Sequence, residues 1–435
     1  MDTPRLKDDT HSARHPPMAA KHQEETSSRR WRPVVRWVFL VAAVALVWPW
    51  RTEVWIWTPV VFPSLSPFVA IGGALAARSL SLLTALALPV FVFAWFIPRV
   101  ACGYGCPVGL LQELVARLRR GSRRPWLRLP SLGVWLAVAT LAGAVFGHPL
   151  FLWLDPLAIF NSGLNAWRLP LTALNLAAGL ALPALLLLEL ALPQFWCRRL
   201  CPLGGLQDLL TRSRRRLARP SGCEKPAVTP PGAAPLFRGR RTFFAACVGA
   251  TGAIAMRTLR GQPSPPLRPP GSLNEGNFTG VCVRCGNCAQ VCPAHVIRPD
   301  LAGGLAGLLT PRLNFAEDFC RADCNRCHQV CPSGAIARLS LVEKRRAVIG
   351  LAHVDLDTCL MALGRECNAC IQHCPYEVIT IAGGADGFSS QPQVDLSRCN
   401  GCGACETVCP VRPERSIRVA ATERARYASL ERFSS

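Results

Sequence analysis

The sequence predicts a chain of two parts, a membrane α-helical bundle followed by a small α+β domain organised around cysteine residues. Three observations predict this division. Half of the 435 residues are apolar, and the mean hydropathy is positive, at +0.23. Long apolar runs fill the part before residue 216, and four runs of closely spaced cysteines fill the part after residue 271. This composition favours at least two domains, one of them in lipid, over a single soluble domain.

Four apolar stretches approach the length of about 20 residues that a helix needs to cross a bilayer. A soluble protein also buries apolar helices, but four such runs with few ionisable residues exceed what one soluble core holds. We therefore expect about four spans plus a short signal-anchor-like segment, preceded by a cytoplasmic N-terminal tail. The tail covers residues 1–33, and the stretches are 34–50, 80–98, 133–154 and 172–195, within a bundle over 34–215.

The net charge of +22 is concentrated in the first part of the chain. Up to Gly271 there are 32 Lys and Arg against 11 Asp and Glu, whereas the remainder has 17 against 16. Basic residues commonly flank membrane spans on the cytoplasmic side, so the excess predicts topology and disfavours nucleic-acid binding. The basic segments 98–132 and 198–219 then place both ends of the bundle in the cytoplasm, since loops 51–79 and 155–171 are nearly uncharged.

The bundle contains an internal repeat at a spacing of 95 residues. CGYGCPVGLLQEL at 102–114 matches CRRLCPLGGLQDL at 197–209, and each copy follows an even-numbered apolar stretch. The two C-x-x-x-C-P pairs are therefore expected to meet at one face, where four thiolates suffice for one further cluster or one tetrahedral metal ion. A pair of redox-active or structural dithiols remains the alternative. The predicted ligands are Cys102, Cys106, Cys197 and Cys201.

Residues 216–271 form a linker rich in Pro, Gly and Arg. Within it, segment 238–255 has the pattern of a twin-arginine export signal, with Arg240 and Arg241 before a weakly apolar run and an A-x-A arrangement at its end. This pattern predicts that the part after it is exported in folded form. A basic patch beside the membrane is the alternative interpretation, because short motifs are unspecific.

Residues 272–435 contain four cysteine runs that all end in C-x-x-x-C-P. Three close cysteines wrap one tetranuclear cluster, and the cysteine before the proline ligates a second cluster in two-cluster ferredoxins. The runs therefore predict four [4Fe-4S] clusters in an α+β ferredoxin-like domain, in preference to zinc knuckles or a disulfide scaffold. The ligands are Cys282, Cys285, Cys288 and Cys292; Cys320, Cys324, Cys327 and Cys331; Cys359, Cys367, Cys370 and Cys374; and Cys399, Cys402, Cys405 and Cys409.

Ionisable side chains near the apolar stretches are candidates for proton transfer, because such groups are rare in lipid. His148 and Asp155 stand at the end of the third stretch and Glu189 stands in the fourth. His148 can accept a proton near neutral pH, and Asp155 can orient or relay it. The structural alternative is that Asp155 caps a turn and His148 bonds to a neighbouring helix.

With these motifs in place, the chain resembles two protein families joined end to end. The first 215 residues resemble the NapH type of membrane ferredoxin through the two C-x-x-x-C-P repeats. The rest is similar to the NapG/MauM type, through the twin-arginine segment and RPPGSLNEGNF leading into VCVRCGNCAQVCP. The resemblance implies a multi-pass protein of the bacterial inner membrane, in contact with lipid, whose ferredoxin domain is periplasmic.

The same resemblance implies a function and a pairing of the runs. The implied function is electron transfer from membrane quinol to a periplasmic redox enzyme or cytochrome, as in a quinol dehydrogenase. A redox maturation factor for a periplasmic metalloenzyme is the alternative. Resemblance to four-cluster ferredoxins implies that run one folds with run four and run two with run three, so that Cys292 joins Cys399, Cys402 and Cys405.

Overall fold

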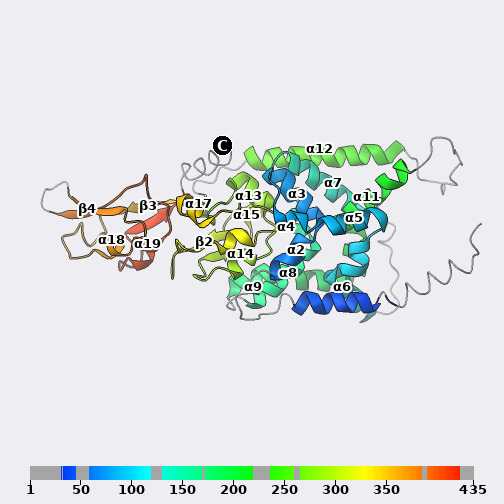
Figure 1. The fold of residues 1–435 in the computed structure, drawn as a ribbon, viewed down its shortest axis with the longest axis horizontal. Helices are drawn as coiled ribbons and strands as arrows, with labels where there is room; N and C mark the ends of the chain where they lie inside the picture. The colour runs from blue at the N-terminus through cyan, green and yellow to red at the C-terminus, as the bar shows by residue number, and fades with distance from the viewer. Residues whose placement is uncertain are drawn as a thin grey trace, which may run out of the picture.

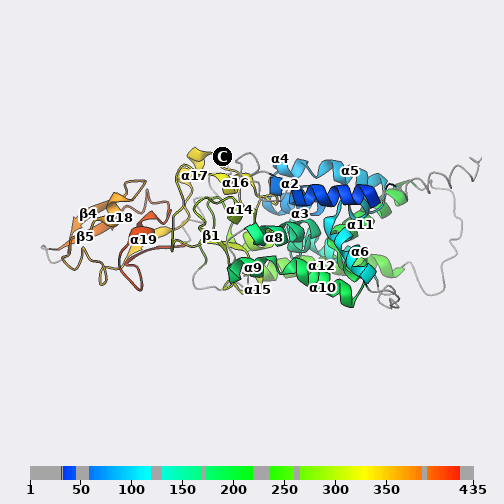
Figure 2. The same cartoon turned by 90° about the horizontal axis from the view of Figure 1, so that it is seen from below.

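The computed structural model describes residues 31, 33–45, 58–118, 130–168, 172–218, 236–258, 265–384 and 389–421. The predicted N-terminal tail, up to residue 30, lies outside them. The molecule is elongated, with a helical part at one end and a cysteine-rich part at the other (Figure 1). In Figure 2 several helices of the helical part run along the long axis of the molecule.

The helical part contains the helix Pro33–Ala45 and a series of mostly short elements. Capping side chains explain where two of these helices begin. The Ser66 side chain accepts a hydrogen bond from the backbone N–H of Val69 at the start of α3, and Ser81 and Thr84 form a reciprocal capping box at the start of α4. The elements are α2 (Thr58–Ser64), α3 (Pro67–Ala77), α4 (Leu82–Ala85), α5 (Leu88–Phe96), η2 (Ala101–Gly105), α6 (Pro107–Leu118), α7 (Leu132–Val145), η4 (Leu152–Leu154), α8 (Pro156–Arg168), α9 (Ala173–Gly179), α10 (Ala181–Ala191), η5 (Trp196–Leu200), α11 (Pro202–Leu217) and α12 (Leu236–Thr258).

The predicted bundle of four membrane spans is wrong. Within the described ranges, no single helix combines the length and apolar character needed to cross a bilayer; only the pair α9 and α10, bent by 46°, meets both criteria jointly. The apolar stretches are broken by local structure. Stretch 80–98 divides into α4 and α5, and α7 ends at Val145 before Gly147, whose φ of +82° takes the backbone out of the helix.

The segment expected to be signal-anchor-like forms α12, which packs along α7 (Figure 1). The contact is close because small residues face each other. A Cβ added at Gly249 would lie 2.1 Å from the carbonyl oxygen of Ala139, and one at Gly143 would lie 3.2 Å from the carbonyl oxygen of Gly249. The Arg241 guanidinium lies over the Trp135 ring, 5.9 Å from its centroid. The twin-arginine-like segment is thus a helix held against the helical part.

The internal repeat is also a structural repeat. In both copies a residue with left-handed φ, Arg99 (+53°) or Gln194 (+63°), precedes a single π-helical turn, η2 or η5. Each turn ends at the second cysteine of the pair. A proline, Pro107 or Pro202, then occupies the first position of α6 or α11, where its missing N–H costs no hydrogen bond. The two copies therefore present their cysteines in equivalent local structures.

The cysteine-rich part consists of two similar units of antiparallel strand pairs and helices of four to seven residues. In the first unit β1 pairs with β2, and Ser272 forms a bridge with Ile336. In the second, β4 pairs with β5 and β3 with β6, all antiparallel. The elements are α13 (Glu275–Val281), α14 (Asn287–Gln290), β1 (Ile297–Pro299), α15 (Gly304–Gly307), β2 (Pro311–Leu313), α16 (Arg326–Gln329), α17 (Leu341–Arg346), β3 (Leu351–Val354), α18 (Ala369–Gln372), β4 (Ile379–Gly383), β5 (Ser390–Val394), α19 (Ala404–Val408) and β6 (Ile417–Ala420).

The start of the cysteine-rich part is held by a buried arginine. Arg268 makes a bidentate ion pair with Glu275, at 2.7 and 2.9 Å, and donates to the carbonyl oxygen of Pro311 at 2.7 Å. Its guanidinium also lies 5.0 Å from the centre of the Phe278 ring. A fork of donors on one planar group suits this set of partners. The segment from Arg268 to Phe278 is therefore fixed before the first cysteine run begins.

Candidate iron–sulfur sites

The sixteen cysteines of the four runs gather into four groups of thiols, each of which draws on two runs. In every group three cysteines come from one run and the fourth precedes the proline of the neighbouring run. Electrostatic contacts between the thiols define the groups. They are site 1 (Cys282, Cys285, Cys288, Cys331), site 2 (Cys320, Cys324, Cys327, Cys292), site 3 (Cys399, Cys402, Cys405, Cys374) and site 4 (Cys359, Cys367, Cys370, Cys409).

The expected pairing of run one with run four, and of run two with run three, is wrong. Cys292 lies close enough to interact electrostatically with Cys320, Cys324 and Cys327, and Cys374 with Cys402 and Cys405. The physical reason is local. The hairpin β1–β2 folds run two back on run one, and the hairpin β4–β5 folds run four back on run three. A short hairpin loses less chain entropy on closing than a contact across the whole domain.

The groups fit a bound [4Fe-4S] cluster. All four thiols of site 1 line one cavity of about 60 Å³, and the backbone N–H of Ile336 donates to Cys331 Sγ at 3.4 Å. Gly403 begins α19 with φ of +87°, and a Cβ there would lie 2.3 Å from the Phe315 ring. No group of three or more His, Cys, Asp or Glu in the described ranges is arranged to hold a single metal ion.

Burial favours the neutral thiol at these sites when no cation is present. It raises the pKa of Cys370 to about 11 and of Cys402 to about 12, and it raises the pKa of Cys285 further. Cluster ligands are thiolates, so cationic iron has to displace these protons. Near site 2 the buried Lys344 adds a positive charge that lowers the pKa of Cys320 against the larger effect of burial. A cation beside the site favours the more negative, reduced state.

The four sites follow one another in a line. Short helices join them: α14 contains Cys288 of site 1 and leads to Cys292 of site 2, and α18 contains Cys370 of site 4 and leads to Cys374 of site 3. Between the two units, the backbone N–H of Cys320 donates to the carbonyl oxygen of Cys402 at 2.9 Å. The order is therefore site 1, site 2, site 3 and site 4, and Figure 1 shows α18 and β4 at the tip farthest from the helical part.

The four cysteines of the internal repeat also come together, in a fifth group that we call the helix site. Cys102 and Cys201 are hydrogen-bonded, and Cys106 and Cys197 interact with Cys102. They line a polar cavity of about 430 Å³. In matching positions, the N–H of Gly109 donates to Cys106 Sγ at 3.4 Å and the N–H of Gly204 to Cys201 Sγ at 3.5 Å.

Two glutamines cross between the copies of the repeat. Gln207 Nε2 donates to Cys102 Sγ at 3.5 Å, and Cys197 Sγ donates to Gln112 Oε1 at 2.6 Å. Each glutamine thus contacts the first cysteine of the other copy, as approximate two-fold symmetry requires. Sequence reasoning missed both as site residues, although Gln112 and Gln207 occupy the same position of the repeat.

Charge is unevenly distributed at the helix site. The hydrogen bond with Cys201 lowers the pKa of Cys102, and the nearby Arg99 lowers it further. Arg99 is itself held by Asp208 through hydrogen bonds of 2.6 and 2.7 Å. Burial raises the pKa of Cys106 to about 12. Cys102 is therefore the thiol of this group that most readily becomes a thiolate.

Helix α8 connects the helix site with site 1. Pro156, at its start, lines the cavity of the helix site. The side-chain amides of Asn161 and Asn165 donate to the carbonyl oxygen of Cys285 at 3.1 and 2.9 Å, and to Asn287 Oδ1 at 2.7 and 3.0 Å. At 1.5 Å per residue, these amides lie about 8 and about 14 Å along the axis from Pro156. One helix therefore sets the separation of the two sites.

The structure places the predicted proton-transfer residues in separate contacts. Asp155 is fully buried and caps α8, accepting from the N–H groups of Leu157 and Ala158 at 3.0 and 3.1 Å and from Ser66 Oγ at 2.5 Å. His148, 4% exposed, contacts the carbonyl oxygen of Gly276 through Nδ1 at 2.5 Å. These are the contacts that the structural alternative predicts, and the role of the two residues in proton transfer stays a prediction.

Glu189 lies at the helix site, although the sequence placed it in an apolar stretch. It is 1% exposed and borders the polar cavity, where its Oε1 accepts from the N–H of Gln194 at 2.5 Å. Its charge raises the pKa of Cys197 in addition to the larger effect of burial. Because Gln194 directly precedes the second π-helical turn and its N-cap Phe195, Glu189 helps to position the second cysteine pair.

One further motif escaped the analysis of the sequence. Cys324, Cys327 and His328 have the C-x-x-C-H spacing of covalent haem attachment. In the structure both cysteines belong to site 2, together with Cys320 and Cys292. His328 is buried, and its Nδ1 contacts the carbonyl oxygen of Ala337 at 2.7 Å. Burial lowers its pKa to about 4, so the ring is neutral. This arrangement suits a structural histidine beside a cluster site.

Two family models match the chain. A model described as a 4Fe-4S dicluster domain matches residues 281–335 and 365–412, and one described as a 4Fe-4S binding domain matches residues 80–125 and 174–220. The first pair of matches separates runs one and two from runs three and four, as the structure does. The second pair contains the two copies of the internal repeat.

Several curated proteins are similar to a part of this chain that makes up between a third and two fifths of its length. The methylamine utilization ferredoxin-type protein MauM of Methylobacillus flagellatus is 38% identical over 171 residues, 37% of this chain and 72% of that protein. The ferredoxin-type protein NapG of Escherichia coli is 36% identical over 192 residues, 39% of this chain and 81% of that protein. Ferredoxin-type protein NapF of Escherichia coli is 33% identical over 146 residues, 33% of this chain and 80% of that protein. No solved structure shows a significant match.

Proposed function

Because the chain belongs to the MauM/NapG family of ferredoxin-type 4Fe-4S proteins, we propose that its electron transfer runs from a membrane quinol to a periplasmic redox protein. In this proposal the helix site receives the electrons, sites 1 to 4 carry them along the molecule, and the acceptor docks near site 4.

The single observation that carries the proposal is the unbroken line of five cysteine groups. The helix site is at one end, α8 joins it to site 1, and the hydrogen bond between Cys320 and Cys402 joins the two ferredoxin units. A ferredoxin that exchanges electrons freely with small partners needs no such length. A line of sites with distinct ends suits transfer between two partners that cannot meet.

The residues of the chain have defined tasks in this transfer. A bound [4Fe-4S] cluster supplies a centre that accepts and releases one electron at a time. Gln112 and Gln207 contact the first cysteine of each pair, and backbone N–H groups donate to the second. Donors to ligand sulfur stabilise the added negative charge of the reduced state. Asn161 and Asn165 keep the helix site and site 1 at a constant separation.

The test compares a quinol with a strong chemical reductant on the full, iron-loaded chain. A Cys102→Ser/Cys197→Ser variant removes one thiolate from each copy of the repeat, and Cys247→Ser on α12, an exposed cysteine outside all five groups, is the matched control. We expect a short-chain quinol to reduce sites 1 to 4 in the wild type and in the control only, while dithionite reduces them in all three. A wild-type chain that dithionite reduces and quinol leaves oxidised contradicts the proposed donor.

We also propose that the protein resides at the bacterial inner membrane, in contact with lipid, with the cysteine-rich part on the periplasmic side. The support is the pattern of segment 238–255 in the sequence, with Arg240 and Arg241 before its apolar run. Replacing both arginines with lysine keeps the charge but removes the planar guanidinium groups that a receptor reads. We expect the double variant to lose protease accessibility of the ferredoxin units in spheroplasts. If the wild type and the double variant are equally accessible to protease, the segment is a basic patch beside the membrane and not an export signal.

A further inference from the structure

An apolar cavity of about 180 Å³ adjoins the helix site. It lies between the helix Pro33–Ala45, α2, α5, η2 and α11. Three phenylalanine rings and several aliphatic side chains form its walls, and no acidic or basic side chain of the described residues borders it. The lining residues used below are Phe39, Phe62, Val90, Phe93, Tyr104 and Cys106.

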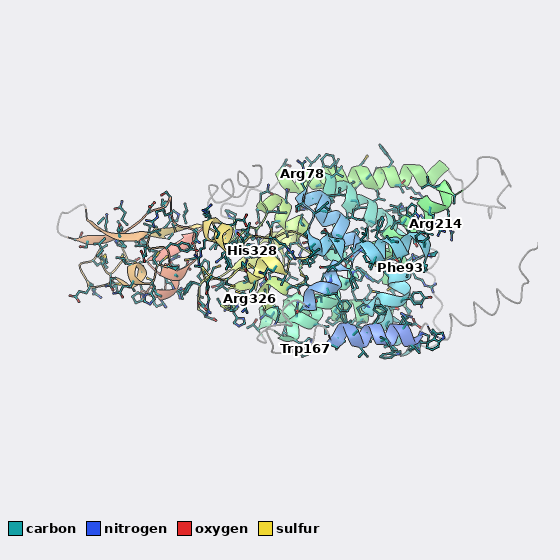
Figure 3. The ribbon with its side chains drawn as sticks, in the orientation of Figure 1. Arg78, Phe93, Trp167, Arg214, Arg326 and His328 are labelled. Carbon is teal, nitrogen blue, oxygen red and sulfur yellow. The ribbon has the colours of Figure 1, made fainter. Side chains whose placement is uncertain are left out.

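The cavity has a buried inner end and an apolar mouth. Phe62 is 4% exposed and packs edge-on against Phe160, with ring centres 6.4 Å apart, whereas Phe93 is 58% exposed. Figure 3 shows Phe93 within the helical part, remote from His328 and Arg326 of the cysteine-rich part. A ligand that fits this lining has an uncharged aromatic or quinonoid ring and an apolar substituent that leaves through the mouth. Nucleotides, sugars and inorganic anions find no polar partners along these walls.

The inner end of the cavity is part of the wall of the helix site. Tyr104 and Cys106 line both the apolar cavity and the polar cavity that holds Cys102, Cys197 and Cys201. Tyr104 and Cys106 are the polar side chains among the residues that line the apolar cavity. They lie at the end of the cavity where the ring of a bound ligand would face the cysteines of the helix site. Behind the same wall, Ser66, between the lining residues Leu65 and Pro67, donates to the buried Asp155. An uncharged ring in this cavity is thus held next to a redox site.

We propose that this cavity binds the ring of a quinol, with its apolar tail leaving between Phe39 and Phe93. The inference rests on the proposed function, since it gives the membrane quinol a place to bind. A [4Fe-4S] cluster held by Cys102, Cys106, Cys197 and Cys201 would accept the two electrons of the quinol one at a time, and the two protons would pass to water, which leaves the quinone. The polar cavity on the other side of Tyr104, which Glu113 and Glu189 border, gives these protons a hydrated path.

The experiment measures binding of a short-chain quinone to the full, iron-loaded protein by equilibrium dialysis, so that the readout does not depend on turnover. Val90→Trp places an indole in the cavity, and Phe93→Ala removes part of its mouth. Phe96→Ala is the matched control, because Phe96 is on the same helix, is also 58% exposed and does not line the cavity. Iron content and circular dichroism establish that each variant is folded, and Phe93→Ala decides the result if Val90→Trp loses iron.

We expect Phe93→Ala to weaken quinone binding roughly tenfold, as removal of about 1.4 kcal/mol of apolar contact does. We expect Val90→Trp to weaken binding at least as much, because its indole occupies the space of the ring, and Phe96→Ala to bind as the wild type does. Equal affinity in all four proteins overturns the assignment of the cavity. If quinol still reduces the clusters in that case, the proposed function stands and the quinol binds elsewhere. If the wild type neither binds quinone nor is reduced by quinol, the proposed function fails together with the cavity.

Discussion

Asn161 and Asn165 illustrate how single residues join the two parts of the molecule. Both lie on α8 of the helical part, and both reach the backbone of the first cysteine run. Their carbonyl partner, Cys285 O, and Asn287 are buried, so that water cannot replace the lost donors. The cost of leaving a buried acceptor without a partner is about 1–3 kcal/mol. These two amides therefore affect both stability and the spacing of the helix site from site 1.

For the double variant Asn161→Ala/Asn165→Ala we predict a fall of about 1–3 kcal/mol or more in the free energy of unfolding. We also predict slower transfer from the helix site to site 1, with the number of clusters unchanged. Chemical denaturation and rapid-mixing absorbance with quinol measure the two effects. Ser162→Ala is the control, because Ser162 is on the same helix and donates at 2.8 Å to Ala178 within the helical part. Equal transfer rates in both variants would show that the amides do not set the spacing.

Asp155 combines a structural contact with an unusual titration. Burial raises its pKa to about 6, against the hydrogen bonds from Ser66, Ala158 and Leu157, which lower it. Between about pH 4 and pH 6, the folded protein therefore keeps a proton on the Asp155 carboxyl group that the unfolded chain has already released. The contribution of Asp155 to the free energy of unfolding is fully present below about pH 4 and is lost as the pH rises through about 6.

We predict that Asp155→Asn flattens this dependence, because an amide does not ionise and its oxygen still accepts from the start of α8. Asp155→Ala removes the cap and costs about 0.5–2 kcal/mol at every pH. Urea denaturation midpoints of the three proteins between pH 4 and pH 7.5 provide the measurement. The wild type should lose stability relative to Asp155→Asn as the pH rises. A constant difference would place the titration elsewhere.

The same variant addresses proton transfer. If His148 and Asp155 serve a quinol, His148→Ala and Asp155→Asn slow quinol-dependent reduction while the cluster content stays constant. Wild-type rates in both would remove the two residues from the mechanism and leave them with the contacts that the structure shows, to Gly276 and to the start of α8.

At the scale of the elements, four short helices of the cysteine-rich part, α14, α16, α18 and α19, each contain a cysteine of one cluster site and lead to a cysteine of another. α14 contains Cys288, the third cysteine of run one, and ends before Cys292, which belongs to site 2. α16 makes the return from site 2 to Cys331 of site 1. Two crossings inside one hairpin unit make the two sites of that unit interdependent.

The pairing predicts which thiols a ligand substitution releases. Cys292→Ser removes a ligand from site 2, so we expect Cys320, Cys324 and Cys327 to become reactive toward iodoacetamide in the native protein. Cys331→Ser is the reciprocal control and releases Cys282, Cys285 and Cys288 of site 1. Mass spectrometry of the alkylated peptides reads out both variants. Alkylation of Cys399, Cys402 and Cys405 in the Cys292→Ser variant would instead support the pairing of run one with run four.

At the scale of the whole molecule, the helical part and the tip of the second ferredoxin unit lie at opposite ends (Figure 1). Site 4 contains Cys359, Cys367, Cys370 and Cys409 and is the site farthest along the line from α8. This arrangement separates the point where electrons are received from the point where they leave. The two ends can therefore be disabled independently.

We predict that Cys367→Ser, which removes a ligand of site 4, leaves reduction of the other sites by quinol intact but blocks transfer to an acceptor. The iron content should fall by about four atoms per chain, from about sixteen in sites 1 to 4. Reduction of added ferricyanide is unsuitable as a readout, because small oxidants reach every exposed site. A c-type cytochrome of the same organism is the appropriate acceptor. Wild-type reduction of the cytochrome would place the exit at another site.

The sequence by itself determined the local features of this protein. The spacing of the four cysteine runs and the repeat of Cys102, Cys106, Cys197 and Cys201 predict groups of thiols. The structure brings those thiols together, because cluster-binding loops and π-helical turns depend on neighbouring residues. The family matches at residues 281–335, 365–412, 80–125 and 174–220 follow the same local patterns.

Only the tertiary structure decided how these local features combine. A hydropathy average reports how apolar a stretch is, but it does not detect the interruptions of the helices at Leu86 and Gly147. It therefore predicted membrane spans where the chain forms shorter helices. Spacing identifies three ligands of each cluster but not the source of the fourth, which depends on the hairpins β1–β2 and β4–β5. The link from Asn161 to Cys285 and the cavity beside Cys106 join residues far apart in the sequence. Contacts of that kind arise from packing across the whole chain, and no pattern within a short window encodes them.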